Sequence, residues 1–432
     1  MLVQFTVLVD GREVGRESRE VSGSAAEIEE QIRQMQQRTG RLALEPALAQ
    51  VARRTPPPWC CGRQMLSRGW MSFTLATTFG EIPVSRCWYR CEQCRRRLAP
   101  ADAQLCCGRH RLTRPLAQRA CQLATLAHFP QLPQLLFQQH GVTLSHHTLV
   151  DLVHDVGGSA DRLRRADAAL SLHRRTPPKG LLARPPRRIW VSVDGTMYCT
   201  NRREPDPAHP GRQRLVWQQM KVGCVAWEDE RGDWHKQLVW GRESPEEFGA
   251  ALWRLACRYG YQEATEKLFA ADGGAWCWDI QARHFSDAVG ILDWYHVSEH
   301  LWSTAKVAAP DQADSWAHTA LHHLHDGGGT ALLDWLRPQI GPRRGAARQA
   351  LEALQTYLIG QQDHLDYPTY RRCGWPIGTG RMESSCKQLV GMRLKGPGMH
   401  WTETGALAVT ALKAIDLNGQ WNIFWRQFTL CA

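Results

Sequence analysis

The chain has 432 residues, with 53 lysines and arginines against 42 aspartates and glutamates, and a formal net charge of +11 at pH 7. This length leaves room for two or three domains, each with its own core. The excess of positive charge predicts an anionic partner, and because the sequence has no long apolar run, nucleic acid fits better than a membrane.

The N-terminal segment and the cysteines indicate the compartment. Met1–Asp10 lacks the basic start, apolar centre and small-residue cleavage site of a signal peptide, which predicts a cytoplasmic protein. The 15 cysteines are clustered rather than spread along the chain. Clustering suits reduced thiols and metal ligation better than the disulfide framework of a secreted protein.

Residues 1–55 are predicted to form an N-terminal accessory hairpin and helix. Leu2–Val21 alternates between apolar and polar residues around Asp10-Gly11, as two strands joined by a turn do. Ser24–Ala52 carries apolar residues at helical spacing behind a serine suited to cap a helix.

Residues 56–111 are predicted to form a zinc-ribbon-like, cysteine-rich module. Two β-prone runs, Trp70–Thr77 and Ile82–Tyr89, separate its cysteine pairs. Cys91 and Cys94 have the two-residue spacing that lets two thiolates from one tight turn bind one zinc ion.

The other half of this zinc site is expected from Cys60 and Cys61, although neighbouring side chains do not easily face one tetrahedral ion. Four further residues are possible substitutes: Cys87, Cys106, Cys107 and His110. The alternative is a set of partly buried reduced thiols without metal.

Residues 112–160 are predicted to be a helix-turn-helix-like DNA-binding region. Three short helices are expected over residues 115–128, 132–140 and 145–156. In one interpretation Ser145–Asp151 opens a recognition helix that presents His146 and His147 to DNA. In the other, the helices form a bundle with histidines on its surface.

Residues 161–188 carry nine basic residues against two acidic ones, together with Pro177-Pro178 and Pro185-Pro186. This composition predicts an extended, poorly packed linker at the main domain boundary. Its charges either follow DNA phosphates or serve solubility alone.

Residues 189–293 are predicted to begin a mixed α/β sheet. The β-prone run Ile189–Val193 ends at Asp194, and Lys267–Ala271 ends at Asp272, so each strand delivers a carboxylate. Between them, strands are expected over residues 221–228 and 235–240, followed by a helix over residues 244–259.

A third acid, Glu383, follows the break Gly378-Thr379-Gly380, at the start of a helix that should run to about Arg393. Converging carboxylates need a cation, and oxygen ligands of this kind suit Mg²⁺ or Mn²⁺. Two such ions assist in-line phosphoryl displacement. The alternatives are an aspartate that caps a helix, above all at Asp272, and the carboxylate pair of a glycoside hydrolase.

Five blocks of sequence resemble one known family. They are Val193-Asp194-Gly195-Thr196, Ala271-Asp272-Gly273-Gly274-Ala275-Trp276, residues 292–301 (LDWYHVSEHL), residues 380–384 with 393–401, and residues 417–425. Over almost its whole length the chain resembles bacterial insertion-sequence transposases of the ISKra type, which are related to the Mutator-like DDE enzymes. It departs from them at Pro58, where the family has the first cysteine of its ribbon.

The resemblance implies an RNase H-like mixed-sheet core with a helical insertion over residues 294–370 and a C-terminal part, 371–432, that carries the third acid. It implies that Asp194, Asp272 and Glu383 are a DDE triad and ligate two Mg²⁺ or Mn²⁺ ions. It also implies that His296 and His300 orient DNA or support the active site, the alternative being an ordinary polar helix face. Independently of the resemblance, Arg381, Lys387, Arg393 and Lys395 lie close to Glu383 in the sequence, which suits DNA-binding or supporting roles, with simple solvated charge as the alternative.

The activity implied is binding of terminal inverted repeats, metal-dependent cleavage that frees a 3′-hydroxyl, and attack of that hydroxyl on target DNA. The implied partners are double-stranded DNA and further copies of the chain, as a homodimer or higher oligomer, near the nucleoid of a bacterial cytoplasm. Two other functions use the same features: a structure-specific nuclease, and a domesticated DNA-binding protein without catalysis.

Overall fold

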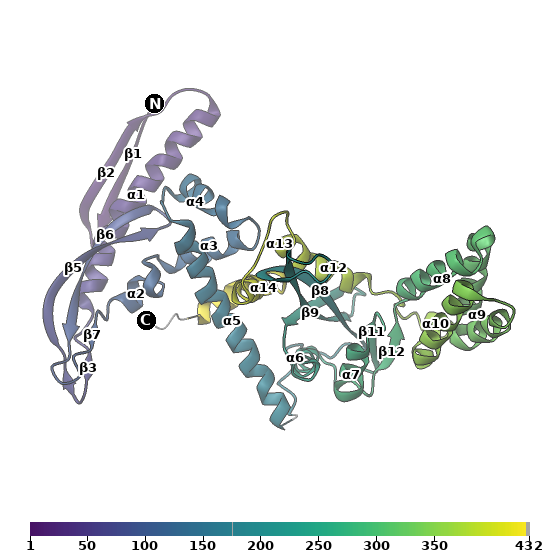
Figure 1. Cartoon of the computed structure of the whole chain (residues 1–432). Coiled ribbons are helices and arrows are strands. Elements are labelled where there is room, and N and C mark those ends of the chain that lie inside the picture. The colour runs from purple at the N-terminus through teal and green to yellow at the C-terminus, as the bar shows by residue number, and fades with distance from the viewer. Residues whose placement is uncertain (175, 429–432) are drawn as a thin grey trace. The chain divides into compact units, whose positions relative to one another are not determined.

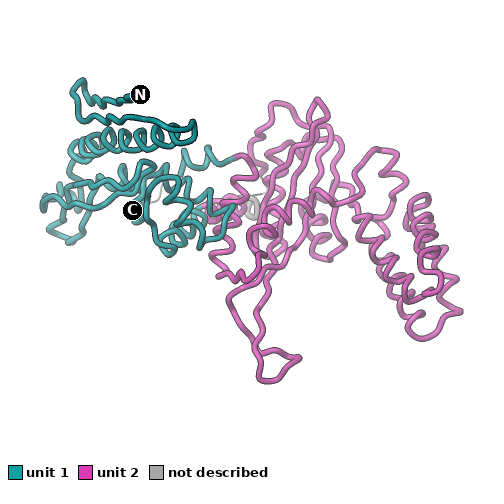
Figure 2. Tube along the Cα trace, turned by 90° about the horizontal axis from the view of Figure 1, so that it is seen from above, with its two compact units in different colours: residues 1–159, 420–432 teal, residues 160–419 magenta. Residues whose placement is uncertain are grey.

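The computed structural model of the chain describes residues 1–174 and 176–428. The chain divides into two compact units (Figure 2). The first contains Met1–Ser159 and the C-terminal stretch from Gln420, and the second contains Ala160–Gly419. Within the described residues, every helix is too short or too polar to cross a bilayer.

The first unit begins with the predicted hairpin and helix. Strands β1 (Leu2–Val9) and β2 (Arg12–Glu20) pair antiparallel around Asp10-Gly11, whose φ angles of 51° and 76° suit a tight hairpin turn. Helix α1 (Ala25–Arg54) starts at Ser24, which forms a capping box with Glu27. Helix α1 packs against both strands (Figure 1).

The cysteine-rich module is a small antiparallel sheet. Strands β5 (Leu66–Thr77), β6 (Gly80–Arg90) and β7 (Arg97–Leu98) pair in that order, and β3 (Trp59–Cys60) forms a short hairpin with β4 (Arg63–Gln64). The two long strands of the predicted ribbon are therefore present. Their buried residues pack against one face of α1, where Leu44 and Leu48 lie.

The predicted helices of residues 112–160 are also present. They are α3 (Arg114–Ala124), α4 (Leu132–His140) and the first part of α5 (His146–Arg174), preceded by the short α2 (Asp102–Leu105). His146 and His147 are exposed in the first turn of α5, with ring centroids 5.5 Å apart. Helix α15 (Trp421–Gln427) completes this unit.

The expectation of an extended linker over residues 161–188 is wrong for its first half, because α5 continues to Arg174. The charges there are paired rather than repulsive. Asp161 lies 2.9 Å from Arg164 and 2.8 Å from Arg165, one helical turn away. The helix-breaking prolines begin only at Pro177, beyond the last helical residue.

The second unit contains a five-stranded sheet in the order β10-β9-β8-β11-β12. Its strands are β8 (Arg188–Pro205), β9 (Gln213–Glu228), β10 (Trp234–Gly241), β11 (Glu266–Ala271) and β12 (Val289–Leu292). The first three strands pair antiparallel, whereas β8, β11 and β12 run parallel. The sheet is therefore mixed, as predicted.

Helices cover both faces of this sheet. On one face lie α6 (Pro245–Arg258), capped by Ser244 and Glu247, and α7 (Ala275–His284). The other face is covered by α12 (Gly380–Cys386) and α14 (Glu403–Leu417) (Figure 1). A π-helical turn, Lys387–Gly391, and α13 (Met392–Leu394) follow α12.

The predicted insertion between β12 and α12 is helical. It consists of α8 (Trp294–Ala308), α9 (Ala313–Ile340), α10 (Gly345–Gly360) and α11 (Tyr367–Arg372). Gly328, with φ 68° and ψ −163°, breaks α9 where the sequence places consecutive glycines. Pro338, in contrast, lies inside α9 without ending it.

Candidate active site and cysteine cluster

Three adjacent parallel strands each deliver an aspartate to one edge of the sheet. Ser192 of β8 pairs with Ala270 of β11, and Ala271 pairs with Leu292 of β12. The aspartates Asp194, Asp272 and Asp293 follow these paired positions. The carboxyl ends of parallel strands meet at one edge of a sheet, and in open α/β sheets ligands bind there.

Asp194 does not stand at a strand end, as the sequence suggested, because β8 continues to Pro205 and pairs with β9 along this length. Gly195 pairs with Lys221 instead of turning the chain. A Cβ atom at Gly195 would lie 2.0 Å from Nε2 of Gln219, an exposed side chain that would have to move to admit a larger residue. At Asp194 the pairing of β8 with the parallel strand β11 has ended, whereas its pairing with the antiparallel strand β9 continues.

The side chain of Asp194 points to the face of the sheet that α12 covers. Val191 and Val193 lie in the core under α6 and α7, and side chains alternate along a strand. The neighbouring helix α12 carries Glu383, whose side chain is exposed. A pocket of about 210 Å³ gathers all three predicted acids: Asp194, Asp272 and Glu383. The same pocket is lined by Asp293 and Glu299.

Asp194 is held by two hydrogen bonds. The amide of Gly195 donates to its Oδ1 at 2.6 Å, and the thiol of Cys386 on α12 donates to its Oδ2 at 3.3 Å. Burial is the main cause that raises the pKa of Asp194, and the negative charge of Asp272 raises it further, against the two hydrogen bonds and Lys395. The protein therefore disfavours the charged form of this carboxyl.

Asp272, like Asp194, accepts hydrogen bonds from one backbone amide and one thiol. Its Oδ1 accepts from the amide of Gly274 at 3.1 Å and from the thiol of Cys277 at 3.6 Å. The residue that caps α7 is Gly274, so the interpretation of Asp272 as the cap of the following helix is wrong. Burial, followed by the charge of Asp272, raises the pKa of the Cys277 thiol, which keeps it a neutral donor.

Asp293 is the most buried of the acids, with 5% exposure, and accepts four hydrogen bonds. Its Oδ1 caps α8 by accepting from the amides of Tyr295 at 2.6 Å and His296 at 3.0 Å. Its Oδ2 accepts from the amide of Thr379 at 2.7 Å and from the Thr379 hydroxyl. Asp293 thereby ties the start of α8 to the loop that precedes Glu383.

The two predicted histidines lie on α8 beside this pocket. His296 lines the pocket, and its Nε2 is 3.3 Å from Nε2 of His300. His300 stacks on Tyr357 of α10, with ring centroids 4.2 Å apart. Burial, followed by the neighbouring His296, lowers the pKa of His300, which favours its neutral form.

The four predicted basic residues lie in different environments. Lys395 donates to the hydroxyl of Thr196 at 2.6 Å, two residues beyond Asp194, and Lys387 is exposed. The guanidinium of Arg381 lies 4.1 Å from the ring centre of Trp234. Arg393 has 2% exposure and lies over Trp401, and burial lowers its pKa to about 10. The buried position of Arg393 favours a supporting role over a phosphate contact.

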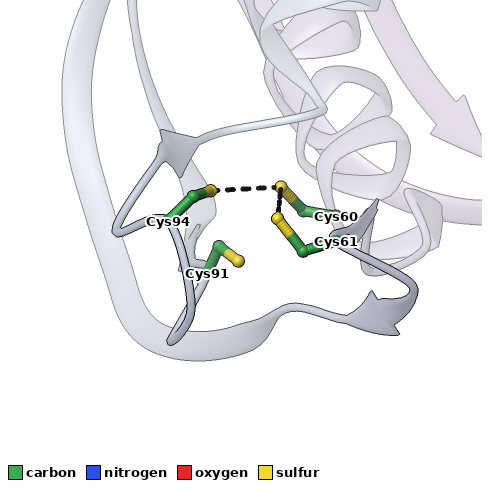
Figure 3. A group of neighbouring side chains, drawn as sticks. All are labelled: Cys60, Cys61, Cys91 and Cys94. Carbon is green, nitrogen blue, oxygen red and sulfur yellow. Dashed lines mark hydrogen bonds between the residues drawn. The ribbon is translucent and has the colours of Figure 1, made fainter.

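A second candidate site lies in the first unit, where four cysteines converge (Figure 3). The sulfur atoms of Cys60, Cys61, Cys91 and Cys94 all lie within 4.8 Å of one another. Zn–S bonds of about 2.3 Å place tetrahedral sulfur ligands about 3.8 Å apart, so this group can hold a zinc ion. The cluster includes Cys60 and Cys61, although they are neighbours in the sequence. The backbone of Cys61 is left-handed, with a φ angle of 49°, and its sulfur lies 3.9 Å from that of Cys60.

The four possible substitute ligands lie outside this cluster. Cys87 contacts the hydroxyl of Ser67 at 3.0 Å, and His110 is 2.7 Å from Asp155. Cys106 packs against the apolar core beneath α1, and Cys107 is buried.

Comparison with known proteins finds no matching family model. It also finds no matching curated protein. Among solved structures, the chain is similar to the "Drosophila P element transposase strand transfer complex", with a TM-score of 0.26 and 10% sequence identity. This similarity covers 73% of the present chain and 81% of the other.

Proposed function

We propose that this protein is a DNA transposase of an insertion sequence, which binds terminal inverted repeats and catalyses metal-dependent strand cleavage and strand transfer. The proposed catalytic and metal-binding residues are Asp194, Asp272 and Glu383. The observation that carries the proposal is the single pocket that these three carboxylates line, although they come from distant parts of the chain.

The chemistry of the donor set fits Mg²⁺ or Mn²⁺. The three side chains offer only oxygen atoms, which are the ligands these ions prefer. The raised pKa of Asp194 shows that burial and Asp272 disfavour its negative charge, and a bound cation would reverse that preference. Two bound ions would supply stabilisation of the attacking and leaving oxygens in an in-line displacement.

The residues of the chain position the reacting groups. Cys386 and Cys277 each donate to one aspartate and so fix the direction of its oxygens. Glu383 stands exposed in the first turn of α12 and lines the same pocket as the two aspartates. Lys395 near Asp194 would contact the phosphate backbone.

The architecture supports an RNase H-like assignment for the catalytic core. Three antiparallel strands are followed by two parallel ones, and the helical insertion separates the second acid from the third. The proposed DNA-binding parts are the cysteine module, with zinc bound at its four thiols, and the helix-turn-helix-like region over residues 112–160. We further propose a homodimer or higher oligomer on DNA, since two transposon ends must be paired.

The test is cleavage of a labelled duplex that carries the DNA flanking the gene, with Mg²⁺ or Mn²⁺, by the native protein and by Asp272→Asn. We expect nicks at a defined end, absent with Asp272→Asn, while both proteins bind the duplex equally. Cleavage by the variant would refute the triad.

The same experiment separates the two alternative functions. Metal-dependent cleavage that follows DNA shape and ignores the terminal repeats would indicate a structure-specific nuclease. Tight binding without cleavage would indicate a non-catalytic DNA-binding protein.

A further inference from the structure

A second pocket, of about 490 Å³, adjoins the acidic pocket and shares Tyr295 with it. Its volume lies within the range of roughly 300–1,000 Å³ that is usual for small-ligand pockets. The two pockets have opposite charge. Five carboxylates line the acidic one, whereas none of the described residues that line the second is acidic.

Tyr295 is an exposed aromatic residue in a fixed position. It belongs to the first turn of α8, two residues after the cap residue Asp293, and has 69% exposure. Its ring packs against the backbone of Gly378, since a Cβ atom there would lie 3.0 Å from Cε2 of the ring. The backbone thus supports part of the ring while much of its surface stays open to a ligand.

Two arginines supply positive charge to the second pocket. Arg371 of α11 lies 3.0 Å from Nδ1 of His325. His325 also contacts Asp326, which is outside the pocket lining. Arg381 lies over Trp234, and with Lys236 it also lines a third pocket of about 350 Å³. The planar guanidinium groups match the geometry of phosphate oxygens.

We propose that the second pocket binds an unpaired nucleotide of the DNA strand whose scissile phosphate lies in the acidic pocket. The base stacks on Tyr295, and its phosphate contacts Arg371 and Arg381. Aromatic stacking beside a cationic surface is how proteins hold single-stranded nucleic acid. This inference rests on the proposed function, and it adds the substrate feature that the site recognises: unpaired bases beside the cleaved bond.

The nucleotide must be unpaired because a stacked base pair inside a duplex exposes neither face of its bases. A base can reach the ring of Tyr295 only at a strand end or after leaving the stack. The third pocket, which shares Arg381, offers the next phosphate along the same strand a cationic surface.

The experiment uses duplexes whose strand ends in a single unpaired 2-aminopurine, with Ca²⁺ replacing Mg²⁺ so that binding is measured without cleavage. The full-length protein should change the fluorescence of this base on binding. Tyr295→Ala should bind the overhang DNA roughly 5- to 150-fold more weakly, the range for loss of one stacked base. Tyr295→Phe, which keeps the ring, should restore both affinity and fluorescence change.

Matched variants separate this subsite from general DNA binding. Trp217→Ala removes an aromatic side chain of 55% exposure from β9 and should leave overhang binding unchanged. Arg371→Ala should weaken overhang binding, whereas Arg337→Ala, which removes an exposed arginine paired with Asp334, should not. None of the variants should change the affinity for a blunt duplex. Free 2-aminopurine deoxynucleotide should show no saturable binding at the same protein concentrations.

Two outcomes would overturn the proposal. If Tyr295→Ala binds the overhang as tightly as the native protein, with the same fluorescence change, the subsite is wrong while the proposed transposase function stands. If the native protein binds neither blunt nor overhang DNA, the proposed function fails and the subsite fails with it.

Discussion

Replacing Asp293 by alanine removes the acceptor of four hydrogen bonds from a site with 5% exposure. Loss of a helix cap costs about 0.5–2 kcal/mol. The amide and hydroxyl of Thr379 would also lose their acceptor, at about 1–3 kcal/mol for a buried donor left unsatisfied. We therefore expect Asp293→Ala to lower the stability of the second unit by about 2–4 kcal/mol.

For a unit of this size, that loss lowers the Tm by roughly 5–15 °C, which thermal unfolding followed by circular dichroism will measure. Asp366→Ala is the matched control. Asp366 caps α11 through one bond, from the amide of Thr369 at 3.2 Å, so its loss should cost about 1 kcal/mol. Asp293→Asn keeps the acceptor for the α8 cap but turns an NH2 group toward the amide of Thr379, so it should lose only the part of the stability that the Thr379 bonds provide.

The reasoning would be refuted if Asp293→Ala lowered the Tm no more than Asp366→Ala. The structural role of Asp293 would also be refuted if Asp293→Asn kept the native Tm but lost metal-dependent cleavage. In that case Asp293 acts as a metal ligand rather than as the residue that fixes the loop before Glu383.

Three further predictions concern the two candidate sites. Cys386→Ala should raise the Mg²⁺ concentration needed for cleavage about 10-fold, because Asp194 loses a positioning donor. Cys386→Ser keeps a donor and should restore the native Mg²⁺ dependence. Equal Mg²⁺ dependence of Cys386→Ala and the native protein would contradict this role. Since the pKa of Asp194 is raised in the fold, its charge lowers stability as the pH rises from the unfolded-state pKa through the folded-state pKa. Asp194→Asn should therefore raise the Tm in EDTA at pH 7 and abolish the rise in Tm that Mg²⁺ gives the native protein, and an unchanged Mg²⁺ effect would exclude Asp194 as a ligand. Cys91→Ser should remove bound zinc in a metal assay, whereas Cys87→Ser should retain it; purified native protein without zinc would refute the site.

The sequence alone predicted most of the local structure of the second unit. The helix expected over residues 244–259 and the strand expected at Ile189–Val193 follow from local patterns, and both are present. The three candidate acids also came from sequence, since two acidic residues after apolar runs and one after a glycine break are visible without coordinates.

The tertiary structure decided how these residues meet. Nothing local shows that β8 continues past Gly195, because this depends on pairing with β9, which comes later in the sequence. The continuation of α5 depends likewise on contacts such as that of Asp167 with Arg254, 2.9 Å apart and distant in sequence. The composition of residues 161–188 suggested a linker because it does not show which charges form ion pairs in the fold.

The same limit applies to the candidate site. Cys386 and Cys277 have no sequence signature as donors, and only packing brings each thiol to its aspartate. Tyr295 lies in a motif visible in the sequence, but its neighbour Arg371 comes from the last helix of the insertion and Arg381 from beyond it. The sequence by itself determined which residues are candidates for the chemistry, because residue type and local spacing set helix, strand and charge. Which of them share a pocket was decided by long-range packing alone.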